Sequence, residues 1–232
     1  MNDQRANMHL YTGPLSMFGA KAWIAALEKG IECEVIMVPF NQRTGYDPKH
    51  PEVLRVNPKG QVPVLIDGDL ELFDSTQLFE YFEDLKPTPP LWPADVRARA
   101  RARNLELQSD EVFFPHVIKL MDLQDRLDEP VAVKACNAIH HFYSRMERVL
   151  DDQPYLCGGL SYADIAFYMA QVFAGRMGAP MGAATPRLLQ WRERMSARRS
   201  VLTVARPLVD YLRKNLRPVP HFLLFADRQE QH

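Results

Sequence analysis

The chain has 232 residues and a mass of 26.7 kDa, which is enough for one large domain or two modest ones with a buried core. Hydrophobic residues make up 47% of the chain and charged residues 25%. These fractions are close to globular averages and exclude a disordered, collagen-like or coiled-coil chain. With 28 basic and 29 acidic side chains, the net charge of -1 provides no overall attraction to nucleic acid or anionic membranes.

The cysteines and the apolar runs exclude further classes. Cys33, Cys136 and Cys157 are widely spaced and include no CxxC motif, so we expect reduced thiols, with neither a disulfide framework nor a metal site. Residues 1–8 are polar and lack the apolar stretch of a secretory signal, which predicts a cytoplasmic protein. The longest apolar run, residues 163–184, is interrupted by Asp164 and Arg176 and therefore predicts a buried helix instead of a membrane span.

The N-terminal half has the pattern of an α/β domain. A strand is expected at residues 8–12, a helix at 17–29 and a second strand at 32–38, which together form a βαβ unit. A short helix at 51–56 follows, and then two strands, 62–66 and 71–73, joined by a hairpin at Asp67-Gly68. Asp74 precedes Gln77 by three positions, as in a capping box, and predicts a helix over 75–85. The predicted order is βαβ, helix, ββα.

A proline-rich stretch separates this half from the rest of the chain. Four prolines, at positions 87, 89, 90 and 93, disfavour a continuous helix there. We therefore predict one domain over 1–86, a linker over 87–94 and a second domain over 95–232.

The C-terminal half predicts a helical bundle. Helix-compatible periodicity covers residues 95–127, 130–150, 162–176, 186–197 and 201–216, and no convincing strand appears. Ser161 and Asp164 form a second capping box, which fixes the start of the third of these helices.

The segment 57–65, with the sequence NPKGQVPVL, contains a proline inside an apolar strand pattern. Pro63 lacks the amide donor that a central strand needs. One interpretation is an edge strand. The other is a cis-proline that leaves the backbone of Val62 unpaired and facing a ligand.

Three features together resemble the glutathione S-transferase family: the segment 57–65, the pair Asp74-Ser75 at the head of a helix, and Ser161-x-x-Asp164 in an all-helical second half. The resemblance covers nearly the whole chain and is closest to cytosolic members of bacterial type. It implies a thioredoxin-like domain followed by a helical domain, glutathione as co-substrate without a metal, and a homodimer.

The resemblance also implies which residues bind glutathione. The backbone of Val62 would pair with the cysteinyl part as an added strand, with cis-Pro63 holding the geometry and Gln61 reaching the glycine end. Lys49 lies where related proteins carry a basic residue for the glycyl carboxylate, although a solvated surface lysine is the alternative.

For the γ-glutamyl end, the resemblance implies that Asp74 faces the ammonium group and that Ser75 binds the carboxylate. A helix N-terminus suits a carboxylate for an independent reason, because its free N–H groups and positive dipole end attract anions. A purely structural role for Asp74, as the N-cap, is the alternative.

The catalytic position should lie between the first strand and the first helix. Alignment of residues 20–30 with the family's first helix places Ser16 on the catalytic serine of the theta-like and phi-like classes. This region has no cysteine, which argues against the cysteine-type classes. Tyr11 is the rival, and an N-cap role is the structural alternative for Ser16. As a catalytic group, Ser16 would donate a hydrogen bond to the glutathione sulfur and favour the thiolate.

The electrophile pocket is expected beside Phe113, Phe114 and His116, with the tail 221–225 as a further wall, although core packing is the default for each aromatic residue. The function implied is a detoxifying transferase that adds glutathione to small apolar electrophiles. A specialised etherase or dehalogenase, or a non-catalytic binding or dimerisation module, remains the alternative.

Overall fold

A computed structural model describes residues 8–41 and 43–224. The chain divides into two compact units. Unit 1 comprises residues 8–90 together with Thr203–Tyr211, and unit 2 comprises Leu91–Leu202 together with residues 212–224. The sequence did not indicate that Thr203–Tyr211 packs with the N-terminal part of the chain. Across the described residues, no helix combines the length and the apolar character needed to cross a bilayer.

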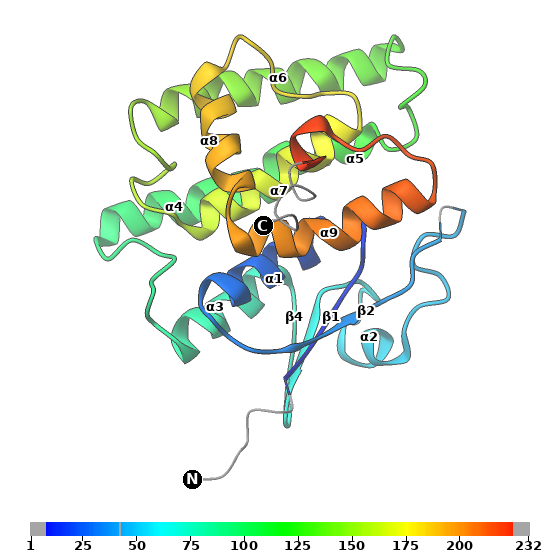
Figure 1. The fold of residues 1–232 in the computed structure, drawn as a ribbon, viewed down its shortest axis with the longest axis vertical. Helices are drawn as coiled ribbons and strands as arrows, with labels where there is room; N and C mark the ends of the chain where they lie inside the picture. Colours follow the sequence, from blue (N-terminus) through cyan, green and yellow to red (C-terminus); the bar gives the residue numbers. More distant parts are fainter. Residues whose placement is uncertain (1–7, 42, 225–232) are drawn as a thin grey trace, which may run out of the picture. The chain divides into compact units, whose positions relative to one another are not determined.

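Unit 1 is built on a four-stranded mixed sheet (Figure 1). Its strands are β1 (Met8–Thr12), β2 (Glu34–Met37), β3 (Val64–Asp67) and β4 (Leu70–Phe73), in the order β2-β1-β3-β4. The parallel pair β1 and β2 is connected through α1 (Met17–Glu28), and β3 runs antiparallel to both β1 and β4. This confirms the predicted βαβ unit and hairpin. The third strand starts at Val64, two residues later than predicted, because Pro63 has no N–H to donate to a ladder.

Side chains alternate between the two faces of the sheet, and each face packs against different helices. Leu10 and Leu65 pack with α1 and with α3 (Ser75–Leu85), whereas Tyr11 and Val64 pack with α2 (Pro51–Val56). Successive strand side chains point to opposite faces, so a single step along β1 moves a side chain from one layer to the other.

Unit 2 is helical, as predicted. Its helices are α4 (Val96–Gln108), the π-helix η1 (Ser109–Phe113), α5 (Phe114–Lys119), α6 (Pro130–Leu150), α7 (Tyr162–Arg176), α8 (Pro186–Ser196) and the ends of α9 (Arg199–Lys214). Helix α7 forms the centre of the unit, because every residue from position 162 to 174 is buried.

The helix predicted over 95–127 is interrupted. Pro115 lacks an N–H and its ring excludes a regular α-helical turn before it. The chain widens instead into the π-helix η1, in which the Phe114 N–H donates to the Ser109 carbonyl, five residues back. Helix α5 then ends at Lys119, and turns occupy residues 120–129.

The predicted capping box at the start of α7 is confirmed and extends beyond its own helix. The buried carboxylate of Asp164 accepts hydrogen bonds from the Ser161 N–H (3.0 Å) and hydroxyl (2.7 Å). It also accepts from the Leu156 N–H and from Nε1 of Trp191 in α8, both at 2.9 Å. Burial raises the pKa of Asp164, while these four hydrogen bonds act in the opposite direction. One carboxylate thus ties α7 to the preceding loop and to α8.

Candidate functional site

The first turn of α1 carries the predicted catalytic residue. Ser16 is the N-cap, and its Oγ accepts a hydrogen bond from the Gly19 N–H at 3.0 Å. Because the oxygen acts as acceptor in that bond, the hydroxyl proton remains available for a second partner. No acidic side chain occupies the first turn, so the positive end of the helix dipole is not neutralised there. A hydroxyl donor and a helix N-terminus therefore converge on one place, which suits an anionic sulfur.

A second hydroxyl, which the sequence analysis missed, lies beside Ser16. Thr12 is 1% exposed, and its Oγ1 has no hydrogen-bond partner among the described residues. A Cβ added to Gly19 would lie 2.0 Å from Thr12 Oγ1 and 3.0 Å from Ser16 Oγ, so both hydroxyls border the same point of the helix. A threonine at the end of a strand is ordinary. The only sequence signal for this contact is the glycine in the first helical turn.

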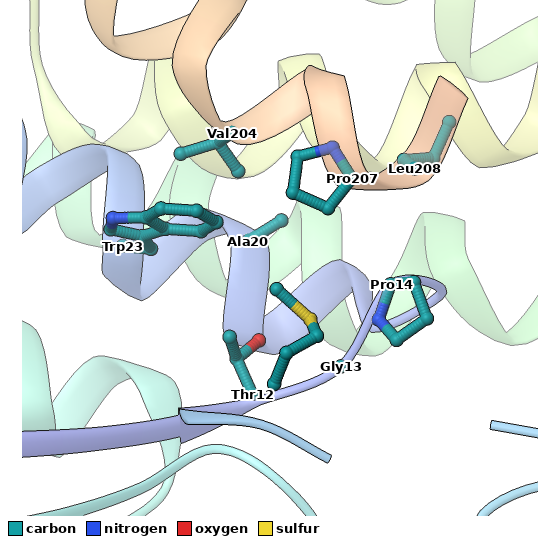
Figure 2. A pocket seen from close by; sticks show the side chains of 9 residues that line it. Thr12, Gly13, Pro14, Ala20, Trp23, Val204, Pro207 and Leu208 are labelled. Carbon is teal, nitrogen blue, oxygen red and sulfur yellow. The ribbon is translucent and has the colours of Figure 1, made fainter. Parts of the chain in front are cut away.

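Thr12 also lines a small hollow within unit 1 (Figure 2). Figure 2 shows Thr12, Gly13 and Pro14 on one side of it and Val204, Pro207 and Leu208 of α9 on the other. Ala20, Trp23 and Met37 complete the lining. Most of the lining side chains are apolar, and the loop that leads to Ser16 forms part of the wall.

Tyr11, the rival of Ser16, lies in the other layer of the unit. Its side chain belongs to the cluster with Val53 and Val64 that faces α2, and its ring centroid is 5.1 Å from that of His50. Burial, reinforced by the nearby carboxylate of Glu52, raises the pKa of its hydroxyl. Tyr11 thus packs in the layer that faces α2, whereas Ser16 caps α1.

Asn57 shapes the turn that leads to the predicted glutathione-binding backbone. It is 4% exposed, and its Oδ1 accepts from the Lys59 N–H at 2.9 Å while its Nδ2 donates to the Gln61 carbonyl at 2.6 Å. Its own carbonyl accepts from the N–H of Gly60, whose positive φ of 58° closes the turn. The sequence analysis included Asn57 in the motif but gave it no role. The structure identifies it as the group that holds Gln61 in place.

The backbone of Val62, which follows this turn, has an unpaired N–H and C=O among the described residues. The Val62–Pro63 peptide bond is cis, which confirms the cis-proline of the second interpretation. Neither backbone polar group of Val62 forms a hydrogen bond with another described residue, since the β3 ladder starts only at Val64. A peptide-like ligand could therefore extend along this segment.

Lys49 lies over the same turn. A Cβ added to Gly60 would be 2.9 Å from Lys49 Cδ, so the aliphatic stem of the lysine packs on the turn before Gln61. Within residues 8–41 and 43–224, its ammonium group belongs to no ion pair. The structure thus brings Lys49, Gln61 and Val62 together.

The head of α3 carries the predicted acidic residue in a strained conformation. Asp74 has φ 76° and ψ 126°, a backbone region that residues other than glycine occupy at a cost of about 1–3 kcal/mol. Its Oδ1 accepts from the N–H groups of Thr76 (3.0 Å) and Gln77 (3.3 Å), which confirms the N-cap. Both caps use the same oxygen, so Oδ2 of this exposed side chain makes no hydrogen bond to a described residue. Ser75 is buried directly beside it as the first residue of the helix.

Two residues expected at the electrophile pocket lie in the interior of unit 2. The Phe113 side chain is fully buried, with ring centroids of Phe142 and Phe167 at 5.0 and 5.6 Å. Phe114 is 4% exposed and contacts Phe173 edge to face. Core packing, the default interpretation, describes both.

His116 is half-buried in α5. Burial lowers its pKa, and the positive charges of Lys119 and Lys134 act in the same direction. His116 therefore favours the neutral form at physiological pH. Phe225, the last residue of the expected tail wall, lies outside the described residues. Among the residues that the structure describes, no group of three histidine, cysteine or acidic side chains could hold a metal ion.

Comparison with known families agrees with this architecture. Residues 10–90 match the model of the glutathione S-transferase N-terminal domain, and residues 107–199 match that of the C-terminal domain. A mixed four-stranded sheet with helices on both faces, followed by an all-helical unit, is the glutathione transferase fold. The two matches together span most of the chain, which belongs to the glutathione S-transferase family.

Relatives by sequence carry two different names. The chain is 33% identical to a stringent starvation protein A homologue from Coxiella burnetii, over 51% of this chain and 54% of that protein. It is 29% identical to glutathione S-transferase Z2 from Arabidopsis thaliana, over 73% of this chain and 74% of that protein. The chain therefore spans about half the length of the first relative and about three-quarters of the second.

Solved structures support the fold. A glutathione S-transferase from Rhodospirillum rubrum superposes with a TM-score of 0.77 at 24% identity, over 93% of this chain and 98% of that one. Ure2p, solved in complex with glutathione, gives a TM-score of 0.74 at 19% identity, over 87% of this chain and 93% of that one.

Proposed function

We propose that this protein is a glutathione transferase that binds the tripeptide on unit 1 and holds its sulfur as a thiolate beside Ser16. The observation that carries the proposal is the Ser16 hydroxyl, which accepts from the Gly19 N–H and keeps its own proton for another partner at the N-terminus of α1. The transferase name of the Arabidopsis relative and the glutathione complex of Ure2p support it.

The cysteinyl and glycyl parts of glutathione would bind along the turn after α2. The N–H and C=O of Val62 would pair with the cysteinyl backbone as one residue of an added strand. Asn57 holds the carbonyl of Gln61, so this backbone is fixed before the ligand arrives. The ammonium of Lys49, lying on the same turn, would neutralise the glycyl carboxylate.

The γ-glutamyl part would bind at the head of α3. Oδ2 of Asp74 is available to the ligand's ammonium group while Oδ1 continues to cap the helix. The ligand's carboxylate would lie at the helix N-terminus, next to Ser75, where the positive end of the helix dipole attracts anions.

The proposed chemistry requires only a shift in the thiol pKa. A free thiol with a pKa of about 8.5 is only a few per cent ionised at pH 7. Lowering that pKa by about two units needs roughly 2.7 kcal/mol of preferential thiolate stabilisation. A charge-assisted hydrogen bond from Ser16 and the end of α1 together supply an amount of this size. The thiolate then forms a C–S bond with an electrophilic carbon, and the leaving group departs with its electron pair.

Replacement of Ser16 tests the proposal. In Ser16→Ala we expect the pKa of the bound thiol to rise by about one to two units and turnover near neutral pH to fall about 10- to 100-fold. Ser16→Thr should retain both the low pKa of the bound thiol and the turnover, because it keeps the hydroxyl.

The matched control for stability is Asp95→Ala, which removes the N-cap of α4 and should leave turnover unchanged. Ser16→Ala and Asp95→Ala should each lower the free energy of unfolding by about 1 kcal/mol, because each removes one helix cap. Unchanged turnover in Ser16→Ala would transfer the role to another group, such as a backbone amide.

A non-catalytic binding module is the second candidate, favoured by the stringent starvation protein A relative, whose name is not that of a transferase. This candidate predicts glutathione binding without turnover on any small electrophile and no effect of Ser16→Ala on the bound thiol. An etherase or dehalogenase would instead release phenol or halide in the same assays. In either case we propose a cytoplasmic homodimer, as is typical of the family.

A further inference from the structure

The loop between β2 and α2 is closed on itself by its own hydrogen bonds. Asn41 and Gly45 form a two-bond bridge, with both N···O distances at 2.7 Å. The Asn41 side chain accepts from the Arg43 N–H at 2.8 Å, and Thr44 Oγ1 donates to the Asp47 carbonyl at 2.8 Å. Residues 43–47 are therefore held by local hydrogen bonds, and Tyr46 lies among them.

Tyr46 contacts the segment before Ser16 at two points. Its Oη accepts a hydrogen bond from the Leu15 N–H at 3.2 Å. Its ring lies so close to Gly13 that an added Cβ would be 2.3 Å from Cε1 and 2.6 Å from Cζ, which only a glycine permits. Gly13 in turn accepts a hydrogen bond from the Ser16 N–H at 3.1 Å. Tyr46 therefore contacts the turn that leads to Ser16 on either side of Pro14, at Gly13 and at Leu15.

The Tyr46 ring packs against a second aromatic residue, Phe40. The Phe40 ring meets it edge to face, with centroids 4.8 Å apart. Phe40 meets Tyr211 of α9 in the same way, at 5.5 Å. All three residues belong to unit 1, so an aromatic chain runs from α9 to the turn before Ser16. Such paired rings restrict each other's motion.

We infer that Tyr46 is a positioning residue for thiolate stabilisation, acting through the turn 13–16 on the Ser16 hydroxyl. The inference rests on the proposed function and adds to it the group that keeps the donor in place. A hydrogen bond to sulfur depends steeply on donor position, and surface turns are mobile unless they are tied down. Positions 13–15 are glycine, proline and leucine, so no side chain before Ser16 in this turn can supply a hydrogen bond that ties it down.

The thermodynamic test compares Tyr46→Phe, which keeps the ring and removes the acceptor, with Tyr46→Leu, which removes both. We expect Tyr46→Phe to raise the thiol pKa of bound glutathione and to lower kcat about three- to tenfold. The change in KM for the electrophile should be smaller. In the Ser16→Ala background the same change should have no further effect on the thiol pKa, because the residue acts through Ser16. Additive effects of the two substitutions on that pKa would overturn the inference.

A second readout does not need glutathione. Tyr46→Phe should accelerate amide hydrogen exchange at Leu15, measured by NMR on the full chain. Tyr81→Phe, which removes a hydroxyl bonded to Asp67 elsewhere in unit 1, should leave that rate and the thiol pKa unchanged. Unchanged Leu15 exchange in Tyr46→Phe would overturn this inference alone. Failure of the wild-type chain to bind glutathione would overturn the proposed function, and with it the role of Tyr46 in thiolate stabilisation.

Discussion

Two side chains at this site, Ser16 and Asp74, each cap a helix in a way that leaves a polar group for a ligand. Ser16 Oγ accepts from the Gly19 N–H, which leaves its own proton available to another partner. Asp74 caps α3 with Oδ1 alone, which leaves Oδ2 exposed. The capping role and the ligand-binding role, which compete as interpretations of the sequence, are therefore compatible for both residues.

The strained backbone of Asp74 allows stability and binding to be separated. In Asp74→Gly the positive φ is relieved, and glycine is itself a tolerable N-cap, so we expect the free energy of unfolding to stay within about 1 kcal/mol of wild type or to rise. Glutathione affinity should nevertheless fall about tenfold or more, because the charged partner of the ammonium is lost.

Asp74→Asn is the matched variant, since its side-chain carbonyl keeps the cap and only the charge is removed. It should lose affinity with little change in stability. Urea denaturation and calorimetric titration measure the two quantities. Wild-type affinity in Asp74→Asn would remove the charge of Asp74 from the binding site.

The three cysteines are predicted to be unreactive. Burial raises the pKa of Cys33 and Cys157 to about 11 and moves that of Cys136 in the same direction. At pH 8 a thiol of pKa 11 is about 0.1% ionised, against roughly a quarter for a free thiol, so alkylation of Cys33 and Cys157 by iodoacetamide should be over 100-fold slower. Because the pH lies below these pKa values, the rate should rise about tenfold per pH unit until about pH 11. Mass spectrometry after timed labelling checks this, and fast labelling near neutral pH would contradict it.

Among the elements, α7 depends on a single buried carboxylate. Asp164 accepts from its own helix N-cap, from the preceding loop and from Trp191 of α8, so it joins three segments of unit 2. Helix α1 is held differently. The Ser16 hydroxyl caps its N-terminus, and Tyr46 from a distant loop accepts a hydrogen bond from the turn before it. Helix α7 is therefore held through a buried carboxylate, whereas α1 is held by hydrogen bonds between neutral groups.

The dependence on Asp164 predicts a large and specific loss of stability. Asp164→Asn keeps the shape but turns an NH₂ group toward groups that are themselves donors, and we expect it to lower the free energy of unfolding by about 3 kcal/mol or more. Ser161→Ala removes one of the four hydrogen bonds and should cost about 1 kcal/mol. Urea denaturation followed by Trp fluorescence compares them. Equal losses in the two variants would show that Asp164 acts only as a local cap.

At the scale of the whole molecule, the helices and strands follow closely from the sequence because their signals are local. Asp74 and the Ser161–Asp164 pair mark helix starts within three or four positions, and the sequence around Pro63 marks the cis-proline. The features that the sequence did not indicate depend on distant packing. Tyr46 and Leu15 are 31 positions apart, and the packing of Thr203–Tyr211 with unit 1 joins opposite ends of the chain. No pattern in a short window records such contacts.

The central claim, that the chain binds glutathione as a thiolate, is tested most directly by calorimetric titration in two buffers of different ionisation enthalpy near neutral pH. If the site lowers the thiol pKa by about two units, glutathione should bind at pH 7 with release of about 0.7 proton, whereas S-methylglutathione should bind with none. Ultraviolet absorbance of the bound thiolate provides the matching optical signal. Binding of both ligands without proton release would leave the tripeptide site but contradict sulfur activation, and the absence of binding would contradict the account of unit 1 as a glutathione site.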